Sequence, residues 1–235
     1  MKKFGTLVTV LLLAINISTA QKQITQGYVK MEITDVTTDN EQLAMQLEMM
    51  KGSLTEIYFD QNTSLTSSDM MGGMIKMKTF TDREKDNFDL TFDMMGQKMW
   101  INEKLSSMGS DPKKVALENS TKVTVDKNNT KTILGYKCYE FTVTSPELEG
   151  ISVKGYLTED IKAVKGLLQN FPSLELAGFP IEYSLVNPTM SIKMTSKEIK
   201  TTVDPSKMVI KTDGFKKLTM AEFQKQMGGM GGFGF

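Results

Sequence analysis

Methionine is the residue type through which this sequence could do unusual chemistry. The chain has 19 methionines among 235 residues. The segment Asp69-Met70-Met71-Gly72 recurs as Asp93-Met94-Met95-Gly96, and Met74 closely follows the first copy. Thioether sulfurs are soft ligands that suit Cu(I), so the candidate metal ligands are Met70, Met71, Met74, Met94 and Met95. The alternative is that these flexible side chains fill an irregular core or line an adaptable apolar surface.

Most residue types of familiar active sites are missing. The chain has no histidine, which excludes Ser-His and Cys-His nucleophile pairs and every zinc site that needs a histidine. The glycines from Gly229 to Gly234 match G-x-G-x-x-G, but no strand precedes them and no helix follows, so they do not predict a dinucleotide site. We therefore expect a non-enzymatic protein with no catalytic residues and no cofactor.

Cys138 is the single cysteine of the chain. One cysteine cannot form an intramolecular disulfide or a thiolate metal cluster. Because Cys138 alternates with apolar neighbours in a predicted strand, we expect a buried and inert thiol. An intermolecular disulfide is the alternative.

The apolar residues of the first two-thirds of the chain recur with a period of two. The pattern appears in Val29, Met31 and Ile33, again from Leu43 to Met49, and again in residues 88–94 and 138–143. Glycine-containing turns separate these runs. This pattern is typical of antiparallel strands with one buried face. We expect a mainly β (α+β) fold with a few short helices, including one beginning at Thr158 and one with a capping box at Thr219 and Glu222.

A sheet face lined by Met, Leu and Phe would enclose an apolar cavity if helices covered it. Unbranched methionine side chains can conform to acyl chains of varied shape. The alternative is a fully packed core without a cavity. The candidate lining residues are Met31, Met45, Met49, Phe88, Phe92, Tyr139 and Phe141.

The N-terminus has the pattern of a cleavable signal peptide. Lys2 and Lys3 precede an apolar run over residues 7–17, and Ser18-Thr19-Ala20 predicts cleavage between Ala20 and Gln21. The protein is then periplasmic or secreted. The apolar run is shorter than the roughly 20 residues of a membrane span, and no later stretch is long enough to be one.

Charge and composition define the remaining parts. The 28 basic and 28 acidic residues give no electrostatic footprint for nucleic acid. After Gln226 the chain becomes almost only glycine, methionine and phenylalanine, which cannot bury a regular face. We expect a signal peptide over 1–20, a single β-rich domain over 21–226 and a disordered Gly/Met-rich tail over 227–235.

One segment resembles a known family. Lys131 to Glu140 resembles the "T-x-x-I-x-G-Y-K-C" signature of the bacterial family called domain of unknown function 4412, and Gly178 to Tyr183 and Gly214 to Thr219 resemble its later motifs. The resemblance implies the fold of the periplasmic lipoprotein-carrier (LolA/LolB-like) superfamily, a curved antiparallel sheet or incomplete β-barrel with helices on its open side. The family brings no catalytic residues. The sequence departs from true lipoprotein carriers, which have a conserved arginine latch, because its single arginine, Arg83, lies in a charged turn.

The resemblance and the apolar alternation together favour an exported protein that binds a lipid or another apolar ligand of the cell envelope. The first alternative is a structural or interaction protein of the envelope with a packed core. The second is Cu(I) binding by methionines.

Overall fold

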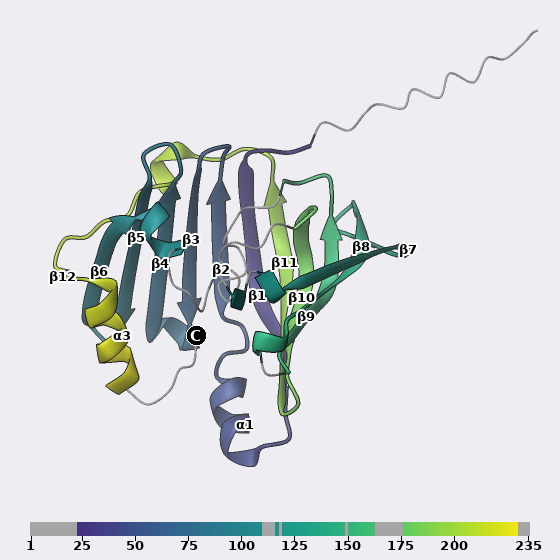
Figure 1. Ribbon diagram of the computed structural model, residues 1–235, viewed down its shortest axis with the longest axis horizontal. Helices are drawn as coiled ribbons and strands as arrows, with labels where there is room; N and C mark the ends of the chain where they lie inside the picture. Colours follow the sequence, from purple (N-terminus) through teal and green to yellow (C-terminus); the bar gives the residue numbers. More distant parts are fainter. Residues whose placement is uncertain (1–22, 110–115, 118, 149, 163–175, 230–235) are drawn as a thin grey trace, which may run out of the picture.

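The computed structural model describes residues 23–109, 116–117, 119–148, 150–162 and 176–229 (Figure 1). The expected signal peptide, with its cleavage site between Ala20 and Gln21, lies outside the described residues. So does most of the helix expected from Thr158. Thr158 itself is the last residue of a strand, and Ile161 forms a bridge with Ile24.

The described residues form one open, curved sheet, which confirms the expected mainly β fold (Figure 1). The strand order is β12-β6-β5-β4-β3-β2-β1-β11-β10-β9-β8-β7. Neighbouring strands are antiparallel except for β12, which pairs with β6 in parallel at one edge. The strands are β1 (Gly27–Thr38), β2 (Leu54–Phe59), β3 (Thr63–Met70), β4 (Ile75–Asp82), β5 (Asn87–Met94), β6 (Gln97–Lys104), β7 (Lys122–Ile133), β8 (Tyr136–Thr144), β9 (Ser152–Thr158), β10 (Phe179–Val186), β11 (Met190–Lys200) and β12 (Lys216–Leu218).

Helical elements are short. Within the described residues, the helices with full bounds are α1 (Glu41–Glu48) and α3 (Met220–Gly229), and the 3₁₀ turns are η1 (Met71–Gly73), η2 (Leu105–Gly109), η3 (Pro146–Leu148) and η4 (Pro205–Lys207). In the part of the chain that the structure describes, no helix has the length and apolar character needed to cross a membrane.

Strand register separates an apolar face of the sheet from a polar face. Residues paired across neighbouring strands point to the same side. One row of pairs runs from Met77 through Phe92 to Met99, whereas the row beside it runs from Lys76 through Asp93 to Lys98 on the opposite side. The apolar face carries most of the buried apolar residues, whereas the row of Lys76, Asp93 and Lys98 places charges of alternating sign on the opposite, more polar face, which also holds the buried Leu65.

The apolar face holds two separate clusters of buried residues. The first, here the main core, contacts strands β1, β2, β8, β9 and β10, and its Phe59 and Phe179 rings stack at 6.1 Å. The second, here the methionine cluster, lies over β4, β5, β6 and β12. It consists of Ile75, Phe92, Met99 and Leu218, with Met70, Met71, Met77, Met94, Phe223 and Met227 packed against them.

The strand expected from Leu43 to Met49 is wrong, because residues 43–48 lie in helix α1 and Met49 is its C-cap residue. The Asn40 side chain accepts hydrogen bonds from the backbone N–H groups of Gln42 and Leu43, which caps the helix. Residues 41–48 are Glu, Gln, Leu, Ala and Met, all good helix formers, and none is β-branched. A short alternation of apolar residues also contains the i, i+4 spacing of a helix, and here local propensity and the cap decide the outcome.

Helix α3 begins as the sequence predicts. Thr219 and Glu222 exchange hydrogen bonds, with Glu222 N–H donating to the Thr219 hydroxyl at 3.2 Å and Thr219 N–H donating to the Glu222 carboxylate at 2.8 Å. The helix continues to Gly229, so the boundary expected after Gln226 falls inside it. The remainder of the expected tail, residues 230–235, lies outside the described residues.

Candidate functional site

The structure does not bring the seven predicted lining residues to one place. Met31 and Phe141 are fully buried in the main core, and Phe92 is buried in the methionine cluster. Phe88 is half-buried on the same face of β5 as Phe92, four residues earlier along the strand. Tyr139 is half-buried beside the ammonium groups of Lys127 and Lys137.

Met45 lies on α1 and Met49 is the C-cap residue of this helix, so neither lies on a strand. Their side chains are 76% and 46% exposed, whereas Leu47 provides the buried contact of this helix. The alternation that grouped them with the lining residues is therefore absent from the fold.

The methionine cluster lies between strands β4 to β6 and helix α3, which makes it the candidate binding site. The Phe223 ring of α3 meets the Phe92 ring of β5 edge-on at 5.7 Å. The Glu103 carboxylate of β6 accepts a hydrogen bond from the Met220 N–H at 2.9 Å, which fixes the start of α3 against the sheet. Helix α3 is thus held at its N-terminus by polar contacts and further along by apolar side chains.

Composition distinguishes the methionine cluster from the main core. In the main core, Met31 is the one methionine among the 13 buried residues, and Met194 is the one methionine among the ten partly buried residues packed against them. In the methionine cluster, five of the six residues packed against the buried centre are methionines, and all of these are half-buried. If methionine served only as general filler, both clusters of one sheet would contain it in similar proportion. Its concentration here gives one region of the apolar face an adaptable, polarizable surface.

The two Asp-Met-Met-Gly segments lie side by side. Met70 pairs with Ile75, which pairs with Met94, so the turn after β3 and the turn after β5 reach the same end of the sheet. The Met95 N–H donates to the Met74 carbonyl at 3.0 Å across these turns. Met70, Met71 and Met94 pack into the methionine cluster, whereas Met74 and Met95 are exposed. Among the described residues, no group of three His, Cys, Asp or Glu side chains could hold a metal ion.

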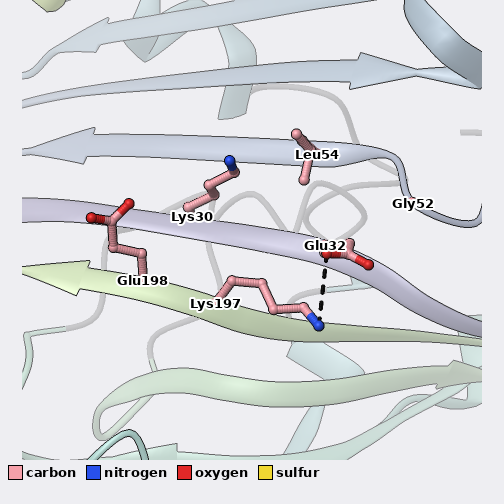
Figure 2. Close-up of a pocket in the computed structure, with 6 residues that line it drawn as sticks. All are labelled: Lys30, Glu32, Gly52, Leu54, Lys197 and Glu198. Carbon is pink, nitrogen blue, oxygen red and sulfur yellow. Dashed lines mark ion pairs between the residues drawn. The ribbon is translucent and has the colours of Figure 1, made fainter.

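A hollow of about 700 Å³ opens on the polar face (Figure 2). It is lined by charged side chains of β1 and β11, including Lys197, whose Nζ lies 3.7 Å from a Glu32 carboxylate oxygen. Gly52 and Leu54 complete its edge. None of the predicted lining or metal-binding residues contributes to this hollow.

Cys138 is fully buried in the main core, as the sequence predicts. Its thiol donates to the Tyr136 carbonyl at 3.4 Å. Burial raises the pKa of the Cys138 thiol to about 11. A thiol that is both buried and protonated is a poor nucleophile.

This pKa predicts that the stability of the protein falls as pH rises from 9 to 11. The folded state holds the Cys138 proton more tightly than the unfolded chain, whose thiol titrates near 9.0. The stabilisation is therefore complete below pH 9 and lost towards pH 11, by about 2 kcal/mol. Urea unfolding at pH 8, 9, 10 and 11 measures this loss as a change in the free energy of unfolding.

The control for this prediction is Cys138→Ala, which removes the titrating group. Burial also raises the pKa values of Tyr28, Tyr58, Tyr136 and Tyr183, and these contribute a loss in both proteins above pH 10. The free energy of unfolding of the wild type must therefore fall more steeply with pH than that of Cys138→Ala already between pH 9 and 10. Equal slopes in the two proteins would contradict the assigned pKa.

Comparisons with known proteins give no family for this chain. No family model matches it, and no curated protein matches it. The likeness to domain of unknown function 4412 therefore rests on the quoted motifs alone.

Several solved structures are similar in arrangement. The lipoprotein LppX of Mycobacterium tuberculosis aligns with a TM-score of 0.38 and 13% identity over 77% of this chain and 89% of LppX. A putative outer-membrane lipoprotein-sorting domain from Vibrio parahaemolyticus aligns at 0.31 and 9% over 88% and 93%. The Pseudomonas aeruginosa MucA/MucB complex contains a chain that aligns at 0.34 and 7% over 81% and 57%. At these TM-scores, the similarity in arrangement supports no inference about the function of this chain.

Proposed function

We propose that this protein is exported to the periplasm or beyond, is not an enzyme, and binds the acyl chain of a lipid or a similar apolar envelope ligand in the methionine cluster. The observation that carries the proposal is the concentration of half-buried methionines between α3 and strands β4 to β6. Such side chains change shape easily, whereas the branched and aromatic residues of the main core are closed to solvent.

The energetics favour a ligand with a long apolar chain. Each buried methylene contributes about 0.8 kcal/mol, while association costs on the order of 4–15 kcal/mol before any affinity remains. Ten methylenes contribute about 8 kcal/mol by the same estimate, which only reaches the middle of that range, so a ligand with a few methylenes would not overcome this cost. A lipid acyl chain supplies enough methylenes, and methionines that turn aside from one another can admit it.

Helix α3 is the element that would move on binding. Its first turn is anchored by the capping box and by Glu103. Its later residues touch the sheet through Phe223 and Met227, which are apolar contacts without directional hydrogen bonds. A chain that enters between α3 and β5 therefore replaces apolar contacts with apolar contacts, and no buried polar group loses its partner.

Binding of cis-parinaric acid, a fluorescent fatty acid, tests the proposal. The variant Met77→Gln with Met94→Gln places two amides in the cluster while keeping side-chain length. We expect the dissociation constant to rise by about tenfold or more, because each unpaired amide costs about 1 kcal/mol or more on desolvation. Urea unfolding of the same variant checks that it is folded at the assay temperature.

The matched control is Met45→Gln with Met49→Gln on α1, where both side chains are exposed. This variant makes the same chemical change away from the cluster and should bind the probe like the wild type. A wild-type protein that fails to bind the probe, or two variants that bind equally, would overturn the proposal. The remaining interpretation would be an envelope interaction protein with a packed core.

A further inference from the structure

Backbone hydrogen bonds connect the two Asp-Met-Met-Gly turns at one end of the sheet. Met71 begins η1, and the Met74 N–H donates to the Met71 carbonyl at 3.5 Å. The Met95 N–H of the second turn donates to the Met74 carbonyl at 3.0 Å. Two backbone hydrogen bonds therefore link Met71 to Met74 and Met74 to Met95, although Met95 follows Met71 by 24 positions in the sequence.

Backbone conformation marks the same residues. Met71 and Met95 have φ values of 54° and 52°, and each precedes a glycine that also has positive φ. This left-handed conformation is costly for a residue with a side chain, and asparagine or glycine is usual in such turns. Leu134 before Gly135 has the same conformation, so the turn type alone indicates no ligand. The two Asp-Met-Met-Gly turns differ from the turn at Leu134 in two ways. Methionine occupies the left-handed position of each, and a backbone hydrogen bond joins one turn to the other.

We propose that Met71, Met74 and Met95 bind one Cu(I) ion through their thioether sulfurs. Sulfur ligands of this kind select Cu(I) over harder divalent ions. Met74 and Met95 are 36% and 75% exposed, so an ion can reach them from solvent. Each side chain has three rotatable bonds beyond a fixed backbone position, which lets three sulfurs converge on one ion.

The nearby carboxylates do not turn this region into a site for a hard cation. Asp93 accepts a hydrogen bond from the Gly96 N–H at 2.9 Å. Asp69 and Asp93 pair with Lys76 in the row on the polar face, opposite the methionines of the cluster. The thioethers are thus the ligand atoms that the turns supply, and the proposed binding involves no change in the oxidation state of copper.

Anaerobic titration with Cu(I), in competition with the chromogenic chelator bicinchoninate, tests the site. We expect one Cu(I) per chain. The variant Met71→Leu, Met74→Leu and Met95→Leu keeps apolar side chains of similar volume and should weaken binding by about tenfold or more. Met45→Leu with Met49→Leu is the control, since it removes two exposed methionines, 76% and 46% exposed, from α1 and its C-cap. Absence of competitive binding, or equal loss in both variants, would overturn the proposal.

Methyl resonances of ¹³C-methyl-methionine locate the ion directly. Cu(I) should shift the methyl signals of Met71, Met74 and Met95 and leave those of Met45 and Met49 unchanged. Shifts confined to other methionines would overturn the assignment. The double variant Met74→Leu with Met95→Leu leaves every residue of the methionine cluster unchanged. It should weaken Cu(I) binding and still bind cis-parinaric acid like the wild type, so the copper site and the proposed lipid site fail or succeed in separate measurements.

Discussion

Gly155→Ala is expected to destabilise the protein by about 3 kcal/mol, at the upper end of the usual cost of overpacking. A Cβ atom at Gly155 would lie 2.1 Å from the Glu182 carbonyl oxygen and 2.6 Å from the Tyr183 Cα. Both are backbone atoms, so rotation of a side chain cannot relieve the contact. Strands β9 and β10 would have to separate in the middle of their ladder, beside the main core.

Urea unfolding of Gly155→Ala measures this cost against a total stability of about 5–15 kcal/mol for a typical domain. The matched control is Lys154→Ala, whose exposed side chain lies next along β9 and whose loss should change stability by no more than about 0.5 kcal/mol. Equal unfolding midpoints for Gly155→Ala and the wild type would show that β9 and β10 do not approach as closely as described.

The close approach at Gly155 also shows what the sequence could not predict. Alternation in residues 152–158 indicates a strand, but the need for glycine comes from β10, which pairs with β9 through a shifted register between Pro180 and Glu182. Pairing between β1 and β11 is similar, because Val29 lies opposite Ile199 across 170 residues of sequence. Period-two patterns identify which side chains share a face of one strand, and they do not identify its neighbours.

The strand predicted at residues 43–49 is wrong for a different reason. The alternation of Leu43, Met45 and Leu47 is too short to separate a period of 2 from a period of 3.6. The capping residue Asn40 and the absence of β-branched residues were the signals that favoured a helix. In a helix at these residues, Met45 and Met49 do not belong to an alternating strand face with the other predicted lining residues.

The meeting of the two Asp-Met-Met-Gly turns was partly predictable. In a meander of antiparallel hairpins, alternate turns lie at the same end of the sheet. The first and third turns of such a series therefore become neighbours, and the two copies of the segment lie at those positions, after β3 and β5. The separation of methionines into a cluster of their own was not predictable, because it depends on α3 and β12 packing back onto β5 and β6 from the far end of the chain.

Phe179→Ala is expected to cost about 3–5 kcal/mol, the range for removal of a buried phenylalanine. Phe179 is fully buried, and its ring stacks on Phe59 among side chains that are closed to solvent. The rigid neighbours cannot close the cavity that the ring leaves, so the loss of packing is retained in full.

Phe92→Ala makes the same chemical change in the methionine cluster, where Phe92 is 3% exposed. Its neighbours Met77 and Met99 are flexible and can move into the space. We therefore expect Phe92→Ala to cost at least about 1 kcal/mol less than Phe179→Ala, since the cost of truncation depends on how well a site collapses. Urea unfolding of both variants, with equal m-values as the check for two-state behaviour, gives the comparison. Equal costs would mean that the methionine cluster packs as rigidly as the main core, and a rigid cluster could not open to admit an acyl chain.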